Sequence, residues 1–256
     1  MMRFALLGHP LSHSFSPKIH NLIYKLYNVD ATYELKDVAQ DDLSQAIIDL
    51  KMGKYQGFNV TIPYKIEIMK YLDDISDEAR LIGSVNTVAI IEGKAIGFNT
   101  DYYGFIDELN ANKLDVNNKD IYVLGTGGAS KAVVKALSDL GAHVSIVSRT
   151  KTDETVSYEE INNITKIDGI VNTTPVGMWP NTSNSPLNEA VTSRAGFVLD
   201  IIFNPLKTKL MSFNKNSYNG LEMLVYQACK AFNIWFSDIN IDKKEIYERI
   251  RGELYE

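Results

Sequence analysis

The chain has 256 residues, of which 45% are hydrophobic and 23% charged, and its formal net charge at pH 7 is −6. This composition indicates a globular protein with a large core and excludes a mostly disordered chain. The acidic balance argues against nucleic acid as a partner, since nucleic-acid-binding proteins usually carry a basic surface. The single cysteine, Cys229, excludes an internal disulfide, and we interpret it as a buried packing residue in a reducing compartment.

No segment of the sequence suggests a membrane or an export signal. The apolar run near the N-terminus is too short for the core of a signal peptide, and no later run has the length needed to span a bilayer. We therefore expect a cytoplasmic protein without a membrane partner.

The first hundred residues alternate short apolar runs with helical patterns, which predicts βαβ units and largely parallel sheets. Ser16 is the expected N-cap of the first helix, with Pro17 at its first position. Another helix is expected to begin near Lys65. The predicted strands are Arg3–Leu7, Tyr33–Lys36, Gly57–Thr61 and an antiparallel hairpin of Val85–Ile91 with Ala95–Phe98, and the predicted helices are Pro17–Tyr27 and Asp41–Met52.

A helical pattern over Asp101–Asn112 leads through a polar connector into a second alternating series. Its predicted strands are Ile121–Leu124, His143–Ser148, Gly169–Thr173 and Val198–Ile202, and its predicted helices are Gly128–Leu140, Leu221–Phe236 and Lys243–Leu254. The chain therefore divides into one α/β domain of residues 1–103 and a second of residues 104–224.

The segment Ile121–Ser130 has the order strand, glycine turn, helix start. Glycines at 125, 127 and 128 let the backbone approach a pyrophosphate, and the N–H groups of the following helix face its charge. Because the turn lies between a buried strand and an amphipathic helix, it predicts a Rossmann-like dinucleotide-binding domain. Ser130 stands where the usual fingerprint has its third glycine.

The end of the next strand distinguishes NADP from NAD. An NAD ribose is normally met there by Asp or Glu, but this chain has Ser148, Arg149 and Thr150. The guanidinium of Arg149 can pair with a 2′-phosphate, and the two hydroxyls can donate hydrogen bonds to it. The sequence therefore favours NADP.

Four polar clusters in the first half lie at predicted strand ends or helix starts: Ser14–Pro17, Asn59–Lys65, Gly83–Thr87 and Gly97–Asp101. Each cluster alone also has a structural explanation as a cap or a turn. Together they bring hydroxyls, amides, one lysine and one carboxylate to element ends, where open α/β sheets bind ligands. They predict a polar small-molecule site.

With these four clusters in order, the chain resembles the shikimate dehydrogenase family. The glycine turn matches the family's nucleotide loop, and Asn172–Met178 and Gly220–Ala228 match further motifs, so the resemblance covers nearly the whole chain. It implies reversible NADPH-dependent reduction of 3-dehydroshikimate to shikimate, in aromatic amino-acid biosynthesis. It also implies an N-terminal substrate-binding domain, a Rossmann-like NADP-binding domain and a cleft between them.

The resemblance implies a role for individual residues. Lys65 and Asp101 would be the catalytic pair, in which protonated Lys65 stabilises the developing oxyanion and donates a proton while Asp101 orients the ammonium. Burial disfavours the protonated form of Lys65 and the charge of Asp101 favours it. The sequence does not decide which of the two effects is larger. The implied substrate-binding residues are Ser14 and Ser16 at the carboxylate, and Asn59, Thr61, Lys65, Asn86, Asp101 and Gln227 at the ring hydroxyls.

The implied cofactor-binding residues are Gly125, Gly127, Gly128, Ala129, Ser148, Arg149, Thr150, Thr173, Met178, Ile201 and Gly220. Because Gln227 has to reach the substrate, the helices of residues 225–256 are expected to pack back on the first domain. Three positions depart from the family. Phe203 replaces a tyrosine and predicts a slower enzyme, Ser148 replaces an asparagine, and the short polar stretch after Thr150 leaves little room for the family's helix.

Other classes of function find little support. His9, His13, His20 and His143 lack metal-ligand spacing, so no metal is expected. No Gly-x-Ser-x-Gly elbow is present, which argues against a serine hydrolase. The aromatic residues Tyr226, Phe232, Trp235 and Phe236 are interpreted as helix packing.

Two rival functions remain open. One is a relative with relaxed specificity that also oxidises quinate, often with NAD; Arg149 argues against it. The other is an inactive NADP-binding or regulatory protein; Lys65 and Asp101 argue against it, whereas Phe203 keeps it open. A monomer and a homodimer are both compatible with the sequence.

Overall fold

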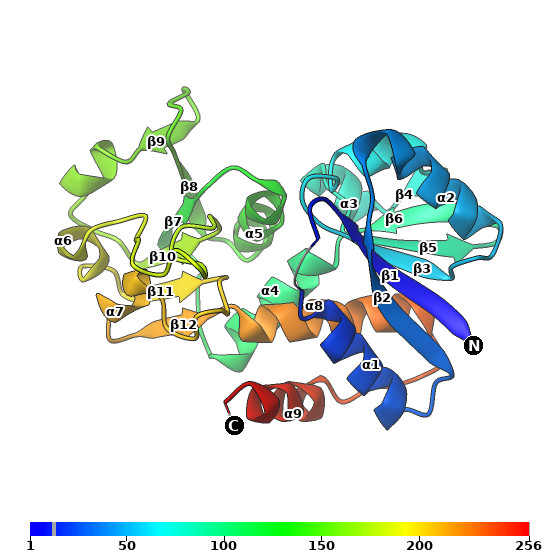
Figure 1. The fold of residues 1–256 in the computed structure, drawn as a ribbon. Helices are drawn as coiled ribbons and strands as arrows, with labels where there is room; N and C mark the ends of the chain where they lie inside the picture. Colours follow the sequence, from blue (N-terminus) through cyan, green and yellow to red (C-terminus); the bar gives the residue numbers. More distant parts are fainter. Residues whose placement is uncertain (12–13, 256) are drawn as a thin grey trace. The chain divides into compact units, whose positions relative to one another are not determined.

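The computed structural model describes residues 1–11 and 14–255. The chain forms two compact units, Met1–Gly104 together with Val225–Glu256, and Phe105–Leu224. Each unit contains a six-stranded sheet with helices packed against it (Figure 1). The predicted fold class, two α/β domains, is confirmed.

The sheet of the first unit is mixed. Its strand order is β2 (Ala31–Asp37), β1 (Met2–Gly8), β3 (Gly57–Val60), β5 (Thr87–Ile91), β6 (Lys94–Phe98) and β4 (Asp74–Ile75). The β1, β2 and β3 strands are parallel, β5 pairs antiparallel with both β3 and β6, and β4 is parallel to β6. The predicted hairpin is therefore present, within a sheet that is less uniformly parallel than expected.

Helices α1 (Ser16–Leu26), α2 (Leu43–Lys51), α3 (Asp77–Ile82) and α9 (Lys243–Tyr255) belong to the first unit. Two predictions about helix starts were wrong. Ser16 is the first residue of α1, and Phe15 is its N-cap; the Ser16 N–H donates to the hydroxyl of Ser14. A 3-10 helix over Glu67–Tyr71 replaces the helix expected near Lys65, whose carbonyl accepts the N–H of Val85 instead.

Helices α4 (Thr100–Ala111) and α8 (Leu221–Trp235) carry the chain from one unit to the other. The aromatic end of α8 packs on the first sheet, where the Trp235 indole lies 4.6 Å from Phe4 and donates a hydrogen bond to the carbonyl of Val88 at 3.1 Å. The rings of Phe232 and Phe236 are tilted against each other, with centroids 4.7 Å apart. The predicted packing role of these aromatic side chains is confirmed, and Cys229 is buried as expected.

The sheet of the second unit is fully parallel. Its order is β12 (Ser217–Asn219), β11 (Phe197–Asp200), β10 (Gly169–Asn172), β7 (Asp120–Leu124), β8 (His143–Ser148) and β9 (Thr155–Ser157). Helix α5 (Gly128–Asp139) follows β7, and the short helices α6 (Glu189–Thr192) and α7 (Lys209–Ser212) flank β11. Between β8 and β10 the described chain forms only β9 and a 3-10 helix, Glu160–Asn163, as its short polar sequence predicted.

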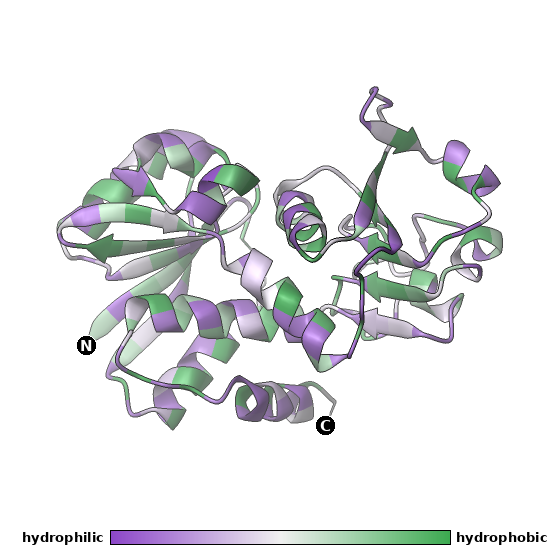
Figure 2. Cartoon of the chain, turned by 180° about the vertical axis from the view of Figure 1, so that it is seen from behind, coloured by the Kyte–Doolittle hydropathy of each residue, from purple (hydrophilic) through white to green (hydrophobic). Residues whose placement is uncertain are grey.

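The hydropathy of the elements matches their burial. In Figure 2 the strands of both sheets carry much of the hydrophobic colour, whereas α9 is mostly hydrophilic. Within the described residues no helix combines the length and hydrophobicity required to cross a bilayer.

Candidate active site

The polar clusters of the first unit meet at one edge of its sheet. Strands β1, β3 and β6 end at this edge, and β5 begins there because it runs antiparallel to β3, with Thr87 opposite both Asn59 and Phe98. Thr61, Asn86 and Asp101 directly adjoin these strand ends. The prediction that element ends gather polar side chains is therefore confirmed for these segments.

Lys65 and Asp101 form a largely buried ion pair. The Lys65 Nζ lies 2.6 Å from Asp101 Oδ2, and the two side chains are 16% and 10% exposed. Asn86 Nδ2 donates to the other carboxylate oxygen, Oδ1, at 2.9 Å. Each oxygen thus accepts a hydrogen bond, which fixes the plane of the carboxylate, and the Lys65 ammonium retains two hydrogens for another acceptor.

Buried threonines orient the Asn86 amide. Its Oδ1 accepts hydrogen bonds from Thr100 N at 2.7 Å, Thr100 Oγ1 at 3.1 Å and Thr87 Oγ1 at 3.1 Å. Asn59 Nδ2 donates to Thr87 Oγ1 at 2.9 Å and to the Asn86 carbonyl at 3.2 Å. Sequence reasoning did not assign Thr87 or Thr100 to the site, although both lie inside the clusters that drew attention to their neighbours.

The remaining substrate candidates lie on separate segments. Ser14 Oγ donates to Ser16 Oγ at 3.2 Å and accepts the Ser16 N–H at the same distance, so the two hydroxyls are adjacent. Gln227 Oε1 of α8 lies 3.3 Å from Thr100 Oγ1, whose single hydrogen is shared between Gln227 and Asn86. Thr61 follows β3, and no hydrogen bond in the described part of the chain ties its hydroxyl to the other candidates.

A buried tyrosine that the sequence did not single out supports Asn59. The Tyr33 hydroxyl donates to Asn59 Oδ1 at 2.7 Å, and its ring stacks on His20 with centroids 4.2 Å apart. Burial raises the pKa of Tyr33 well above its ordinary value and lowers the pKa of His20 to about 3. Both side chains are therefore neutral at neutral pH.

The predicted nucleotide residues share one edge of the second sheet. Because this sheet is parallel, the carboxyl ends of its strands meet at the same edge, where open α/β sheets bind nucleotides. In the structure Gly125 follows β7, Ser148 ends β8, and Thr173, Ile201 and Gly220 directly follow β10, β11 and β12.

The glycine turn has the geometry that a pyrophosphate requires. Gly125 has a φ of +107°, and a Cβ there would lie 3.0 Å from Thr173 Oγ1. Gly127 precedes α5, and no described side chain caps this helix, so a ligand can approach its N-terminus. Ser130 Oγ donates to the Gly125 carbonyl at 2.6 Å, so the serine at the third glycine position braces the turn.

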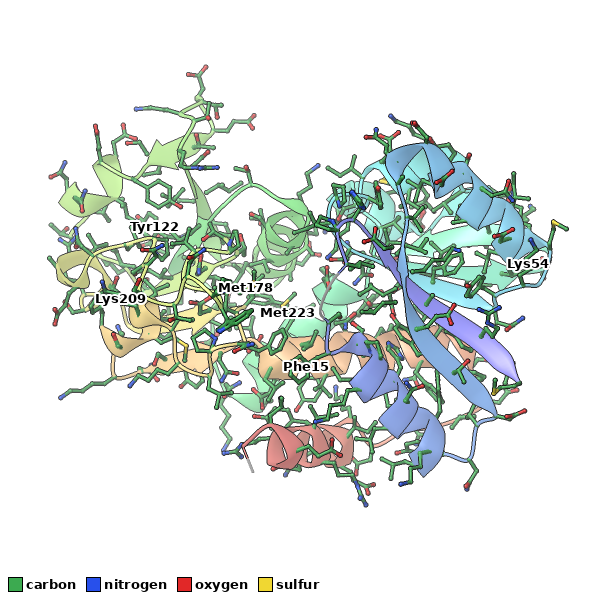
Figure 3. All side chains as sticks on the ribbon, in the orientation of Figure 1. Phe15, Lys54, Tyr122, Met178, Lys209 and Met223 are labelled. Carbon is green, nitrogen blue, oxygen red and sulfur yellow. The ribbon has the colours of Figure 1, made fainter. Side chains whose placement is uncertain are left out.

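The segment after β8 fits a 2′-phosphate. Arg149 is exposed directly beyond the strand, and the Ser148 hydroxyl accepts the N–H of Thr150 at 3.2 Å, which fixes the turn. Met178 is 46% exposed on the connection after β10 (Figure 3). Gly220 packs so closely on Ile201 that a Cβ would lie 2.1 Å from the Ile201 carbonyl oxygen.

The three described histidines lie in separate parts of the structure. His9 pairs with Asp37 at 2.6 Å and His143 with Asp120 at 3.3 Å, while His20 is buried. His13 lies outside the described residues. Among the described side chains no group of three His, Cys, Asp or Glu is arranged to hold a metal ion.

Two family models match the chain, the shikimate dehydrogenase substrate binding domain over residues 6–88 and the shikimate 5′-dehydrogenase C-terminal domain over residues 220–251. Shikimate dehydrogenase (NADP(+)) of Clostridium beijerinckii is 43% identical, over 94% of both chains.

Solved structures agree with these sequence matches. A chorismate mutase/shikimate 5-dehydrogenase fusion protein of Clostridium acetobutylicum matches with a TM-score of 0.95 at 36% identity, over 100% of this chain and 99% of that one. Shikimate 5-dehydrogenase of Thermus thermophilus, in complex with NADP(H) and shikimate, matches with a TM-score of 0.88 at 32% identity, over 98% and 99%.

The parallel sheet with its glycine turn, together with the buried lysine–carboxylate pair of the other unit, defines a dinucleotide-dependent oxidoreductase built from two α/β domains. Within that class, the chain belongs to the shikimate dehydrogenase family. The family predicted from the ordered motifs is thus confirmed.

Proposed function

We propose that this protein is an NADP-dependent oxidoreductase that reversibly reduces 3-dehydroshikimate to shikimate, in the shikimate pathway of aromatic amino-acid biosynthesis. The observation that carries the proposal is the Lys65–Asp101 pair, held at 2.6 Å and braced by Asn86. Its support is the membership of the chain in a family whose matched relative is an NADP-dependent enzyme.

The substrate carboxylate is held by Ser14 and Ser16. Their hydroxyls lie beside each other at the first turn of α1, an 11-residue helix whose N-terminus favours negative charge. Two neutral donors and the helix terminus bind an anion without adding a charge of their own.

The ring hydroxyls are held by amides and by the catalytic pair. Both Nδ2 hydrogens and one Oδ1 lone pair of Asn59 are already hydrogen-bonded to protein groups. The remaining Oδ1 lone pair is one acceptor site for the substrate. Asn86 retains one Nδ2 hydrogen and acts as a donor. Thr61 and Gln227 complete the set, and an analogue without a matching hydroxyl leaves its partner among these groups unpaired.

Lys65 carries the proton of the reaction. In reduction its ammonium donates a proton to the carbonyl oxygen as negative charge develops there, and in oxidation the neutral amine takes the proton of the hydroxyl. Asp101 keeps Nζ in place and accepts a hydrogen bond from a neighbouring ring hydroxyl. The nicotinamide of bound NADPH supplies the hydride.

The second unit supplies the residues for NADP. The backbone of Gly125, Gly127, Gly128 and Ala129 faces the pyrophosphate at the N-terminus of α5. Arg149 pairs with the 2′-phosphate, with Ser148 and Thr150 beside it. Thr173, Met178, Ile201 and Gly220, at the same sheet edge, contact the rest of the cofactor.

These assignments give each unit a function. Residues 1–103 with the returning helices of 225–256 bind the substrate, and residues 104–224 bind NADP. We place the protein in the cytoplasm with small molecules as its partners, as a monomer or a homodimer.

Product identification tests the proposal. The purified protein is incubated with shikimate and NADP, and the mixture is separated and analysed by mass spectrometry. We expect a product two mass units lighter than shikimate, formed together with equimolar NADPH. Binding of NADP without any product would support the alternative of an inactive binding protein, which Phe203 keeps open.

A further inference from the structure

Two side chains outside the assigned site, Tyr33 and Thr87, join the substrate-site amides into one chain of hydrogen bonds. The Tyr33 hydroxyl donates to Asn59 Oδ1 at 2.7 Å, and Asn59 Nδ2 donates to Thr87 Oγ1 at 2.9 Å. Thr87 Oγ1 donates to Asn86 Oδ1 at 3.1 Å, and Asn86 Nδ2 donates to Asp101 Oδ1 at 2.9 Å. All four hydrogen bonds are buried.

The four bonds share one direction, each running from donor to acceptor toward the Asp101 carboxylate. In such an arrangement the bonds polarise and strengthen one another.

Tyr33 and Thr87 are themselves rigidly held. The Tyr33 ring lies within 6° of parallel to His20, and both of its backbone polar groups bond to Asn21, at 3.0 and 3.3 Å. Thr87 is fully buried and lies opposite Asn59 in the β3–β5 ladder. The hydroxyls therefore occupy fixed points from which the amides take their orientation.

We propose that Tyr33 and Thr87 are positioning residues of the substrate site. They hold Asn59 and Asn86 in the one amide orientation that leaves an acceptor on the first and a donor on the second for the ring hydroxyls. This inference rests on the proposed function. It adds to that function two hydroxyls that touch no substrate and yet determine how strongly the substrate hydroxyls are recognised.

The test compares Tyr33→Phe, Thr87→Val and the double variant with the wild type in shikimate oxidation. Each single variant is expected to raise the KM for shikimate roughly 10-fold, with kcat changed less than about 3-fold and the KM for NADP unchanged. Both substitutions break the same chain of hydrogen bonds. The KM for shikimate of the double variant should therefore rise by much less than the roughly 100-fold that independent effects would give.

Matched controls separate positioning from general damage. Tyr24 is a buried tyrosine whose hydroxyl has no hydrogen-bond partner in the described part of the chain, so Tyr24→Phe should leave the KM for shikimate unchanged. Thr87→Ser keeps the hydroxyl and should restore most of the affinity that Thr87→Val loses. Melting temperatures identify any variant that fails to fold. If Tyr33→Phe fails to fold, the comparison of Thr87→Val with Thr87→Ser still tests the positioning role.

Three results would each overturn the inference while the proposed function stands. They are an unchanged KM for shikimate in both single variants, KM increases that multiply in the double variant, and a KM of Thr87→Ser as high as that of Thr87→Val. A wild-type protein that neither binds nor oxidises shikimate would overturn the proposed function and the inference with it.

Discussion

At the scale of single residues, the proposed chemistry depends on one lysine held by one carboxylate. Lys65 makes its 2.6 Å contact with Asp101 at 16% exposure, so the ammonium is shielded from bulk water and fixed in direction. A charge in such a setting stabilises an oxyanion more strongly than it would in water, because little solvent has to reorganise.

Lys65→Ala is expected to lower kcat by a factor of about 10² to 10⁴, with a much smaller effect on the dissociation constant of shikimate. Steady-state kinetics and calorimetry of shikimate binding measure the two quantities. Lys70→Ala is the control, since Lys70 is 67% exposed and pairs only with Glu67 within the described residues. A Lys65→Ala enzyme with the kcat of the wild type would remove Lys65 from the mechanism.

The resemblance to the family implies a tyrosine near the substrate at the position that Phe203 occupies. One additional hydrogen bond of about 1 kcal/mol predicts that Phe203→Tyr increases kcat/KM for shikimate by roughly 5-fold. Phe203→Leu, which adds no hydroxyl, should give no increase. If the tyrosine variant leaves both kcat and KM unchanged, the slow-enzyme interpretation of this position is wrong.

The sequence could predict the catalytic candidates but not what holds them. Lys65 and Asp101 were named through the resemblance to the family, because they lie within two of the four ordered polar clusters. Thr87 and Tyr33 could not be distinguished from packing residues, because a buried hydroxyl in a strand follows the same alternating pattern as a methyl group. Only the register that sets Thr87 opposite Asn59 gives it a partner.

At the scale of elements, the attachment of α8 to the first sheet depends on one glycine. A Cβ on Gly57 of β3 would lie 2.3 Å from Trp235 Nε1, which hydrogen-bonds the neighbouring strand at Val88. The indole can reach that carbonyl only because position 57 has no side chain.

Gly57→Ala should therefore lower the free energy of unfolding by about 1–3 kcal/mol, as overpacking in a buried contact does. Urea denaturation measures this change in the free energy of unfolding. Gly252→Ala provides the contrast, since a Cβ at this position of α9 would have no described atom within 4 Å beyond its chain neighbours and its own helix backbone. An alanine there should stabilise by about 0.5–1 kcal/mol. Equal effects of the two alanines would contradict the role assigned to Gly57.

Helix α4 contains a buried carboxyl group, that of Glu108. It makes no hydrogen bond to any side chain or backbone group of the described residues. Glu108 is 0% exposed, and burial, followed by the nearby charges of Glu222 and Asp200, raises its pKa well above the ordinary value. A raised pKa in the folded state means that this group's contribution to stability is present below its unfolded pKa. The contribution is lost as the pH rises toward the folded pKa.

Glu108→Gln should remove this loss, because the amide stays neutral and can donate toward the two carboxylates. The wild type is expected to lose up to about 1.4 kcal/mol of stability per pH unit above roughly pH 4.3, until the folded pKa is reached. The variant should therefore be the more stable protein at pH 8 and show a flatter profile between pH 5 and 8. Parallel melting-temperature profiles for both proteins would contradict this account of Glu108.

At the scale of the whole molecule, the alternation of elements was enough to predict two α/β units. The periodic patterns of the helices and strands reflect which side of each element is buried. This periodicity can be read from the local sequence, whichever distant element covers the buried side. The two-residue strand β4 and the four-residue helices α6 and α7 were missed, because so few residues carry no measurable period. The mixed pairing of the first sheet depends on contacts between distant segments, which the local sequence does not encode.

The central claim, a shikimate dehydrogenase that uses NADP, is tested most directly by initial rates of nicotinamide absorbance change. Shikimate and quinate are each offered with NADP and with NAD, at matched concentrations. We expect shikimate with NADP to exceed the other three combinations in kcat/KM by a factor of about 10² or more, through Arg149 and the paired amides. Equal rates with quinate or with NAD would contradict it.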